Sequence, residues 1–217
     1  MEVCRADRRA GTRAVVSVET VVLLDAEGEA IGTAPKREVH HGHTPLHLAF
    51  SAYLFSDDGE LLLTRRAADK RVFPGLWTNS VCGHPAPGEC LPEAVSRRAR
   101  VELGAQVRGL RLVLPAFAYR AQMDGIVENE RCPVYMGWLD RGRPLVLDPS
   151  EVGEVEWVDW RTCARQVAAG ERPVSPWCVE QVRQLMALGD DMTQWPQADV
   201  DLLPPAAPRV LGGAGPA

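Results

Sequence analysis

The sequence predicts an α+β fold. Strand-like runs, separated by turns that contain Gly or Asp, occupy most of the first 160 residues. One clearly delimited helix interrupts them between Pro92 and Gly104, and helical patterns return towards the C-terminal end. With 217 residues the chain fits one domain that can bury a sizeable core without disulfides. We predict this domain over residues 19–189, a flexible leader over 1–18 and a disordered tail over 190–217.

Composition narrows the functional classes. The formal net charge of −5 gives no overall positive field, so we expect no nucleic-acid or membrane partner and only local binding of anions. No run approaches the roughly 18 apolar residues of a membrane span, and no signal peptide is visible. The six cysteines are irregularly spaced, which favours a reduced state over a disulfide framework. We therefore expect a cytoplasmic protein.

The N-terminal third predicts two hairpins. Strands over residues 19–25 and 29–33 flank a turn at Glu27 and Gly28. Strands over 46–55 and 60–64 flank a second turn at Asp58 and Gly59. The second hairpin delivers basic residues to the end of a strand, where they are either simply solvated or able to clamp a diphosphate. These residues are Arg65, Arg66 and Lys70.

The central helix has explicit start and stop signals. Pro92 suits a first helical position, because the N–H that proline lacks would be unpaired there. Gly104 is a typical C-terminal cap. Arg98 and Glu102 are four residues apart, so they share one stripe and can act together on one ligand.

The remainder of the chain predicts three strands and two helices. A polar turn at Asp124 and Gly125 joins the first two strands, and Ser175 followed by Pro176 marks the start of the last helix. The strands cover 111–120, 126–138 and 154–160, and the helices cover 161–169 and 175–188.

Two groups of residues are candidates for a metal site. Four of the five histidines lie between His40 and His47, where the ordinary alternative is a surface loop. We keep that ordinary reading for His41 and His43. In the strand over 126–138, Glu128 and Glu130 share a face. They are either surface residues of an edge strand or buried carboxylates that need a cation or a proton.

The spacing from Gly83 to Ala105 resembles a modified Nudix box, G-x5-E-x7-R-E-U-x-E-E-x-G-U, in which U is aliphatic. Five positions of the box are in register, whereas Arg98 and Val101 replace two of its glutamates. In Nudix hydrolases these carboxylates collect the cations that assist attack by water. The resemblance therefore implies a protein that binds a diphosphate but is poorly equipped to hydrolyse it. The matching residues are Gly83, Glu89, Arg97, Glu102 and Gly104.

The flanking motifs resemble the type I isopentenyl-diphosphate isomerase family, from about Val21 to about Met186. The family usually has an aromatic residue at the position of Val101, which bears on packing there. This resemblance implies a Nudix-type α/β/α sandwich with a mixed central sheet and an N-terminal β-hairpin extension, present as a monomer or a weak homodimer. The motifs are LHLAF (46–50), LLLTRRA (61–67), PGLWTNSVCGHP (74–85), RRARVELG (97–104), GIVENERCPV (125–134) and SPW (175–177).

The resemblance also implies two metal sites. The first would hold zinc, manganese or magnesium (Zn2+, Mn2+ or Mg2+) with three imidazoles and two carboxylates, a ligand set that suits such ions. The second would hold Mg2+ with Glu102 and oxygens of the diphosphate. The ligands of the first site would be His40, His47, His84, Glu128 and Glu130.

The implied reaction converts isopentenyl diphosphate into dimethylallyl diphosphate through a tertiary carbocation. Cys82 and Glu130 would make the two proton transfers, in an order the sequence leaves open. Tyr119 would hydrogen-bond Glu130, and the Trp177 ring would face the carbocation. The diphosphate would be held by Lys36, Arg66, Lys70 and Arg98.

Three other functions stay open from the sequence. A Nudix hydrolase of nucleoside diphosphate derivatives would lack two box glutamates and would not need Cys82 or Trp177. A binding or regulatory protein on the same fold would not need an intact catalytic set. A related enzyme would isomerise or cyclise a longer or methylated prenyl diphosphate.

Overall fold

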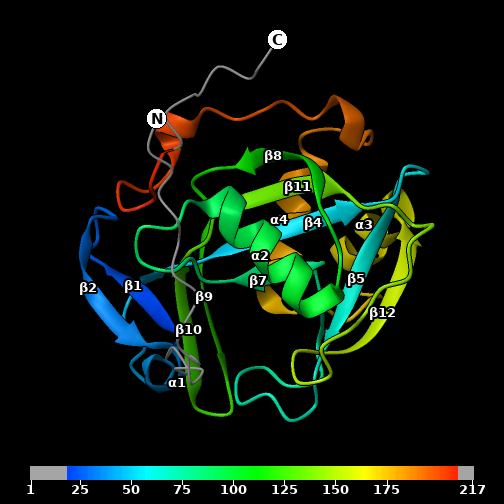
Figure 1. Cartoon of the computed structure of the whole chain (residues 1–217). Coiled ribbons are helices and arrows are strands. Elements are labelled where there is room, and N and C mark those ends of the chain that lie inside the picture. Colours follow the sequence, from blue (N-terminus) through cyan, green and yellow to red (C-terminus); the bar gives the residue numbers. More distant parts are fainter. Residues whose placement is uncertain (1–18, 210–217) are drawn as a thin grey trace, which may run out of the picture.

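A mixed seven-stranded sheet, called here the central sheet, lies in the middle of the computed structural model, which describes residues 19–209 (Figure 1). Its main strand order is β12-β5-β4-β11-β8. The short strands β6 and β7 pair with β5 and β4. Strand β4 runs parallel to β11 and antiparallel to β5. The bounds are β4 Phe50–Phe55, β5 Glu60–Arg66, β6 Trp77–Thr78, β7 Val81–Gly83, β8 Arg108–Leu114, β11 Val134–Trp138 and β12 Val152–Asp159.

A second sheet of five strands has the order β2-β1-β3-β10-β9. Strands β1 and β2 form an antiparallel hairpin at its edge, as the sequence predicted. Strand β3 pairs in parallel with β10, which places His47 opposite Glu130. The bounds are β1 Thr20–Leu24, β2 Ala30–Pro35, β3 His47–Leu48, β9 Ala118–Met123 and β10 Ile126–Arg131.

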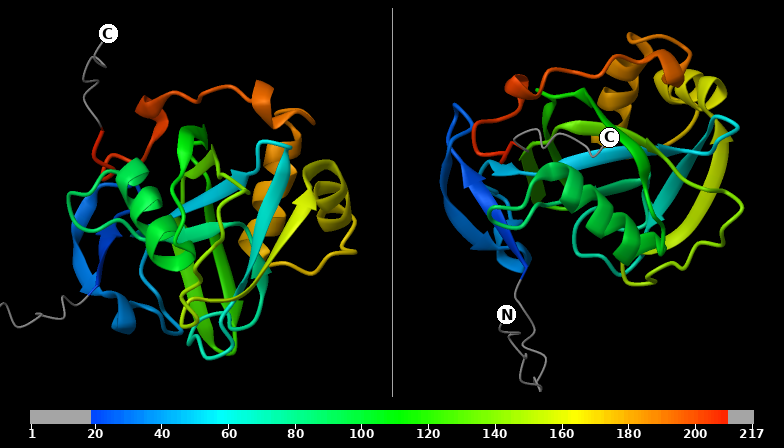
Figure 2. Two further views of the ribbon diagram at one scale, coloured as in Figure 1. Left: turned by 45° about the vertical axis from the view of Figure 1, so that its right-hand side comes forward. Right: turned by 45° about the horizontal axis from the view of Figure 1, so that its top comes forward.

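Helices cover both faces of the central sheet. Helix α2 packs on one face, and α3 and α4 pack on the other (Figure 2). The middle strand β4 is buried throughout: Tyr53 and Phe55 face α3 and α4, whereas Phe50 and Leu54 face α2. The α/β/α sandwich implied by the resemblance is therefore confirmed. The helices are α1 Lys36–Val39, α2 Leu91–Leu103, α3 Trp160–Ala168 and α4 Pro176–Met186.

Helix α2 ends as the sequence predicted. Gly104 has a left-handed backbone (φ 63°), and its N–H donates to the Arg100 carbonyl at 3.1 Å. A Cβ at this position would lie 2.8 Å from a side-chain carbon of Val146. Glycine is therefore favoured both by the backbone angle and by the space available.

Three predicted strands are each divided between the two sheets. Residues 46–55 form β3 and β4, 111–120 contribute to β8 and β9, and 126–138 form β10 and β11. The prediction of single strands was wrong because each segment crosses from one sheet to the other. Pro115 and Pro133 mark two of the crossings, where a residue without an N–H cannot continue a ladder.

The prediction of a disordered tail from residue 190 is also wrong as far as residue 209. This segment contains two 3₁₀ turns, η1 Met192–Gln194 and η2 Val200–Leu202. Trp195 and Leu203 are buried against opposite faces of the sandwich, because scattered apolar residues suffice to dock a proline-rich chain. The predicted leader, 1–18, and residues 210–217 lie outside the described residues.

Within residues 19–209, the helices are all too short or too polar to cross a lipid bilayer.

Candidate active site

A cavity of about 520 Å³ collects polar side chains from both sheets and from α1, α2 and α4. Its volume lies in the range typical of small-molecule sites. All the site residues predicted from the sequence line it, with the exception of His47. His47 is fully buried and contacts the lining residues His84 and Glu130. The exposed His41 and His43 do not belong to the lining, in agreement with their ordinary reading.

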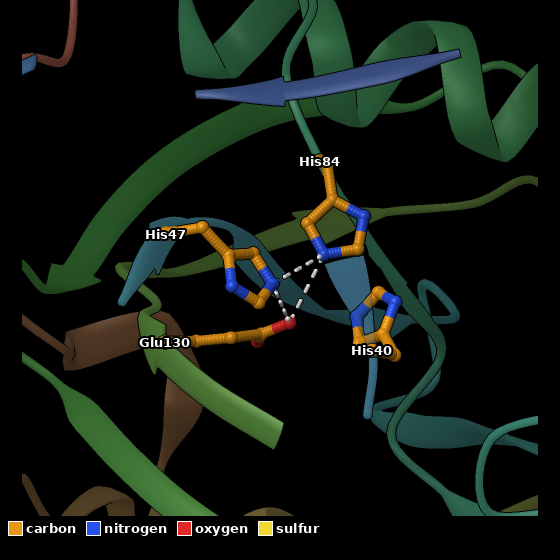
Figure 3. A group of neighbouring side chains, drawn as sticks. All are labelled: His40, His47, His84 and Glu130. Atoms are coloured by element: carbon orange, nitrogen blue, oxygen red, sulfur yellow. Dashed lines mark hydrogen bonds and ion pairs between the residues drawn. The ribbon is translucent and has the colours of Figure 1, made fainter. Parts of the chain in front are cut away.

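Three imidazoles and one carboxylate converge at one end of the cavity (Figure 3). One potential ligand atom from each of His40, His47, His84 and Glu130 lies within 4.8 Å of all the others. The Nε2 atoms of His47 and His84 are 3.2 Å apart, and they lie 3.4 and 3.0 Å from Glu130 Oε1. We call these four residues and Glu128 the His/Glu cluster.

Backbone carbonyls orient two of the imidazoles. His40 Nδ1 lies 3.2 Å from the Lys36 carbonyl oxygen, and His47 Nδ1 lies 2.9 Å from that of Pro45. If Nδ1 donates to each carbonyl, Nε2 carries a lone pair directed at the cluster. Metal-bound histidines in proteins usually have such a partner on the other ring nitrogen.

Glu128 completes the cluster through His40. Its Oε2 atom lies 3.1 Å from His40 Nε2, yet neither atom makes a well-aligned hydrogen bond to any part of the chain that the structure describes. Both residues are buried, and a buried polar atom without a partner is costly. A divalent cation would satisfy these atoms, so the chemistry of the donor set fits a metal ion.

Charge in the cluster is concentrated on Glu130. Burial alone would raise the pKa of Glu130, but hydrogen bonds and charge from His47 and His84 hold it well below its usual range. Burial lowers the pKa of His84 to about 3, against the opposing effect of Glu130. A neutral His84 beside an ionised Glu130 is the combination that binds metal ions.

At the other end of the cavity, which we call the cationic end, basic side chains are already paired with carboxylates. Arg98 contacts Glu102 and, at 3.1 Å, Glu151. Lys70 also contacts Glu151. Glu19 bridges Lys36 at 2.7 Å and Arg98 at 3.3 Å.

Arg98 and Glu102 are neighbours along α2, as their spacing predicted. Burial disfavours the charge of Arg98, but Glu102 and Glu151 outweigh it and raise its pKa. Burial raises the pKa of Glu102, with Arg98 opposing the shift. A buried guanidinium thus stands where the Nudix box usually has a carboxylate.

Arg66 is held differently from the other cations. Its guanidinium donates to the backbone carbonyls of Val72 (2.7 Å) and Phe73 (2.9 Å). Its central carbon lies 5.7 Å from the centre of the Trp177 ring. Among the described residues it has no ion pair, so its charge remains available for an anion.

Two residues of the Nudix box support the site without lining the cavity. Arg97 makes two hydrogen bonds of 2.7 Å to the carboxylate of Glu89 and one of 3.1 Å to the His84 carbonyl. A bidentate arginine–carboxylate pair fixes geometry well. This pair therefore holds the loop that presents His84.

Cys82 stands in β7, with its thiol lining the cavity. The Sγ atom donates to Asn79 Oδ1 at 3.0 Å and lies 3.5 Å from Ser51 Oγ. Burial raises the pKa of the Cys82 thiol, so it is neutral at pH 7.

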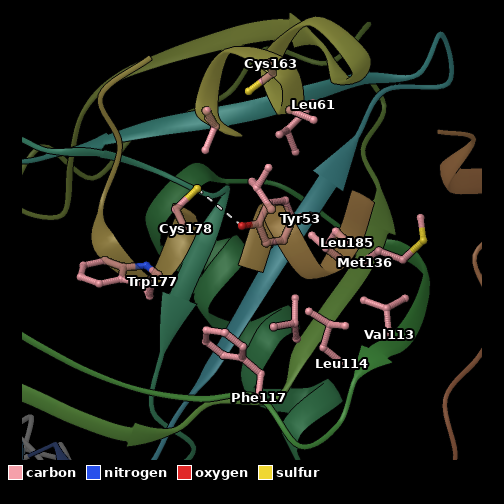
Figure 4. Close-up of a cluster of buried hydrophobic side chains, with 14 of the residues drawn as sticks. Tyr53, Leu61, Val113, Leu114, Phe117, Met136, Cys163, Trp177, Cys178 and Leu185 are labelled. Atoms are coloured by element: carbon pink, nitrogen blue, oxygen red, sulfur yellow. Dashed lines mark hydrogen bonds between the residues drawn. The ribbon is translucent and has the colours of Figure 1, made fainter. Parts of the chain in front are cut away.

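Two aromatic rings complete the lining. Trp177 lies in the first turn of α4, near Cys178 (Figure 4). Its ring centre is 5.4 Å from that of Tyr119. Tyr119 is the ladder partner of Glu130 across β9 and β10. No hydrogen bond joins Tyr119 to Glu130 within the described residues, although the two residues are paired across the strands.

Sequence reasoning missed three residues that contact the predicted ones. Glu19 and Glu151 are counter-ions of the cationic end, and Asn79 accepts the hydrogen of Cys82. Asn79 belongs to the PGLWTNSVCGHP motif, and this motif is the signal from which it could have been identified. No pattern in the sequence distinguished either glutamate from an ordinary surface residue.

Fold and site together define a Nudix-domain protein, and a family model described as the NUDIX domain matches residues 45–178. A protein of Deinococcus radiodurans has a similar fold, with a TM-score of 0.58 and 23% identity over 76% of this chain and 98% of that one. A MutT protein of Methanosarcina mazei gives a TM-score of 0.51 and 20% identity, covering 66% of this chain and 94% of that one. At these identities the likeness concerns the fold alone.

Relatives with much higher identity specify the branch. An isopentenyl-diphosphate Delta-isomerase of Saccharopolyspora erythraea is 52% identical over 90% of this chain and 100% of its own length. Enzymes of the same name from Mycolicibacterium vanbaalenii (55% identity, 80% of this chain and 94% of the relative) and Rhizobium rhizogenes (50%, 88% and 91%) are equally similar. The chain belongs to the isopentenyl-diphosphate Delta-isomerase family of Nudix proteins.

Proposed function

We propose that the chain converts isopentenyl diphosphate into dimethylallyl diphosphate by adding a proton to one carbon and removing a proton from another. Family membership supports this activity. The observation that carries it to individual residues is the meeting, in one cavity, of a neutral thiol, an ionised carboxylate and a tryptophan ring. These groups belong to Cys82, Glu130 and Trp177.

The cationic end would hold the diphosphate through Lys36, Arg66, Lys70 and Arg98. All four line the cavity, and guanidinium and ammonium groups suit phosphate oxygens. Mg2+ bound by Glu102 would join the diphosphate to α2, in keeping with the preference of Mg2+ for few carboxylates plus phosphate. The diphosphate then serves as a handle and leaves the reaction unchanged.

The His/Glu cluster would hold the second divalent cation, Mn2+, Zn2+ or Mg2+. Mixed imidazole and carboxylate ligands do not select one of these ions. A cation bound there would supply a fixed positive charge that keeps Glu130 ionised and the three histidines neutral.

Cys82 and Glu130 would carry the two proton transfers. An alkene is a very weak base, so the acid has to act in a site from which water is excluded. The Cys82 thiol carries a proton at pH 7, and Glu130 is able to accept one. Tyr119, beside Glu130 on the neighbouring strand, would hand a proton between that carboxylate and the substrate. The order of the two transfers is not assigned.

Trp177 would stabilise the tertiary carbocation. An indole ring face attracts a desolvated cation by about 2 kcal/mol or more. Trp177 is buried and lines the cavity, which satisfies the requirement for desolvation. Substituting Phe would keep a smaller ring face, so it should retain more activity than Ala.

The test is incubation of the purified chain with isopentenyl diphosphate and Mg2+ in deuterated water. We expect dimethylallyl diphosphate that carries deuterium, without release of phosphate. The Cys82→Ala variant should fold normally and make no product. Phosphate release from nucleoside diphosphate derivatives would support a hydrolase, and turnover of only longer or methylated prenyl diphosphates would change the substrate class. The cytoplasmic location and the monomeric or weakly dimeric state stay predictions.

A further inference from the structure

We infer that Asn79 is a positioning residue that holds the Cys82 thiol and the Trp177 indole in a fixed relation through its side-chain oxygen. The inference rests on the proposed function, which assigns both groups to the reaction. Asn79 itself is fully buried in the loop between β6 and β7 and does not line the cavity. It acts through the residues that do.

The orientation of the Asn79 amide follows from its neighbours. The Nδ2 atom donates to the backbone carbonyls of Ala52 (3.1 Å) and Val81 (2.9 Å). Carbonyl oxygens only accept hydrogen bonds, so the nitrogen must face them. The oxygen therefore faces the opposite side, where all the neighbouring groups are donors.

Three donors meet at Asn79 Oδ1. Cys82 Sγ lies 3.0 Å away, Trp177 Nε1 3.2 Å and Thr78 Oγ1 2.9 Å. An indole N–H is only a donor, and Trp177 is buried, so losing this acceptor would leave the N–H without its partner. One oxygen thus sets the positions of a thiol from β7 and a ring from α4.

A second connection fixes α4 to the same loop. The Ser175 N–H donates to the Trp77 carbonyl at 2.8 Å, and Ser175 Oγ lies 2.8 Å from Thr78 Oγ1. Among the described residues, the Ser175 hydroxyl makes no capping hydrogen bond to α4 and instead contacts Thr78. These two contacts attach the start of α4 to β6, in addition to the hydrogen bond between Trp177 and Asn79.

This arrangement has a chemical consequence for both groups. A thiol that donates its hydrogen to an amide oxygen is held in one rotamer. An N–H bond lies in the plane of its ring, so tying it to Asn79 fixes the direction of the ring face. Small displacements of reacting groups reduce rates strongly even where binding is intact.

The decisive comparison is between Asn79→Asp and Asn79→Leu. Asp keeps an acceptor where Oδ1 stands, whereas Leu keeps the approximate volume without any polar atom. We expect Leu to lower kcat at least about tenfold more than Asp, and both to leave KM for isopentenyl diphosphate within about twofold. A merely structural role predicts the opposite ranking, because a buried Asp would place an oxygen against two carbonyl oxygens.

Ser80→Ala is the matched control. Ser80 is the next residue, is equally buried, and bonds Leu54 N–H at 2.8 Å and the Leu62 carbonyl at 2.6 Å, without contact to the proposed catalytic groups. It should lower the melting temperature without changing kcat. Equal kcat for the Asp and Leu variants, or an equal loss in Ser80→Ala, would overturn the inference.

Two measurements on the full chain are independent of turnover. The Trp177 indole N–H resonance, assigned with Trp177→Phe, should move upfield in Asn79→Leu and not in Ser80→Ala. The alkylation rate of Cys82 by iodoacetamide should change at least about threefold. If Leu does not fold, Asn79→Ser replaces it. Unchanged resonance and alkylation would refute the positioning role, whereas a wild-type chain without isomerase activity would refute only the proposed function.

Discussion

The two ends of the cavity differ in how completely their charges are matched. At the cationic end, Lys36, Lys70 and Arg98 each pair with a carboxylate of the same chain. In the His/Glu cluster, His40 Nε2 and Glu128 Oε2 have no hydrogen-bond partner within residues 19–209. One end must exchange internal partners for its ligand, while the other gains partners that it lacks. Ligand binding should therefore add more stability in the His/Glu cluster than at the cationic end.

Removal of the divalent cation should have the largest effect on turnover and stability, because it leaves the His/Glu cluster without its ligand. Chelation should abolish turnover, lower the melting temperature, and be reversed by adding a divalent cation. His84→Ala should lower turnover by more than the 10–100-fold that is typical when an outer-shell partner of a metal ligand is removed. Added metal should not restore the turnover of this variant. His43→Ala, exposed and outside the cluster, should behave as wild type. Elemental analysis measures the metal content of the protein. Full turnover with less than a stoichiometric amount of metal would contradict this difference between the two ends of the cavity.

Arg98→Leu should destabilise the cationic end, because it leaves Glu102 and Glu151 without their shared partner. Removing one member of a buried ion pair costs about 3–5 kcal/mol of unfolding free energy. The matched variant is Arg108→Leu, whose exposed pair with Asp57 should contribute about 0–1 kcal/mol. Urea unfolding measures both, and equal losses would show that the cationic end is no more closely matched than the surface.

Glu151→Gln tests the same pairing through pH. Burial would raise the pKa of Glu151, but Lys70 and Arg98 lower it to about 2, from an ordinary value of 4.5. A lowered pKa means that the carboxylate stabilises the fold above pH 4.5 and loses this contribution as the pH falls towards 2. The stability difference between wild type and Glu151→Gln should therefore shrink between pH 6.5 and pH 3.5 in urea unfolding. A constant difference would show that Glu151 acts through packing alone.

Glu19→Gln should have the smallest effect. Glu19 is half exposed and pairs with Lys36 and Arg98, so it would compete with a diphosphate for these two cations. Releasing an exposed ion pair is worth a few tenths of a kcal/mol, so KM for isopentenyl diphosphate should fall about twofold. Glu38→Gln, which removes the exposed partner of Arg37, is the control and should leave KM unchanged. A higher KM in Glu19→Gln would show that Glu19 assists binding.

The sequence predicted which residues gather at the cavity better than it predicted the contacts between them. Local signals were sufficient for Gly104, for the N-terminal hairpin and for helices α2, α3 and α4, but not for the short α1. The spacing of Glu128 and Glu130 left surface and buried readings equal, and the structure buries both. Glu128 and Glu130 are buried against His40 and His47, which come from another part of the chain. Hydrophobic periodicity describes local structure and does not predict such long-range contacts.

The errors share one physical origin. Residues 46–55, 111–120 and 126–138 have continuous strand character because both sheets demand the same extended backbone. The crossings between sheets are set by packing, which propensity does not register. The burial of Trp195 was not predicted for a similar reason. The composition of its segment suggested disorder, and the surface that buries Trp195 exists only in the folded sandwich.

The parallel pairing of β3 and β10 has a consequence for how this chain tolerates change in length. His47 and Glu130 are opposite each other in that ladder, so a one-residue insertion within either strand would turn one of these proposed metal ligands to the other face. Insertions in the connections outside these strands, such as the segment 140–150, would leave the pairing untouched. We therefore expect changes in length to be tolerated in loops, because the distance between His47 and Glu130 is set by hydrogen-bond register and not by their spacing along the chain.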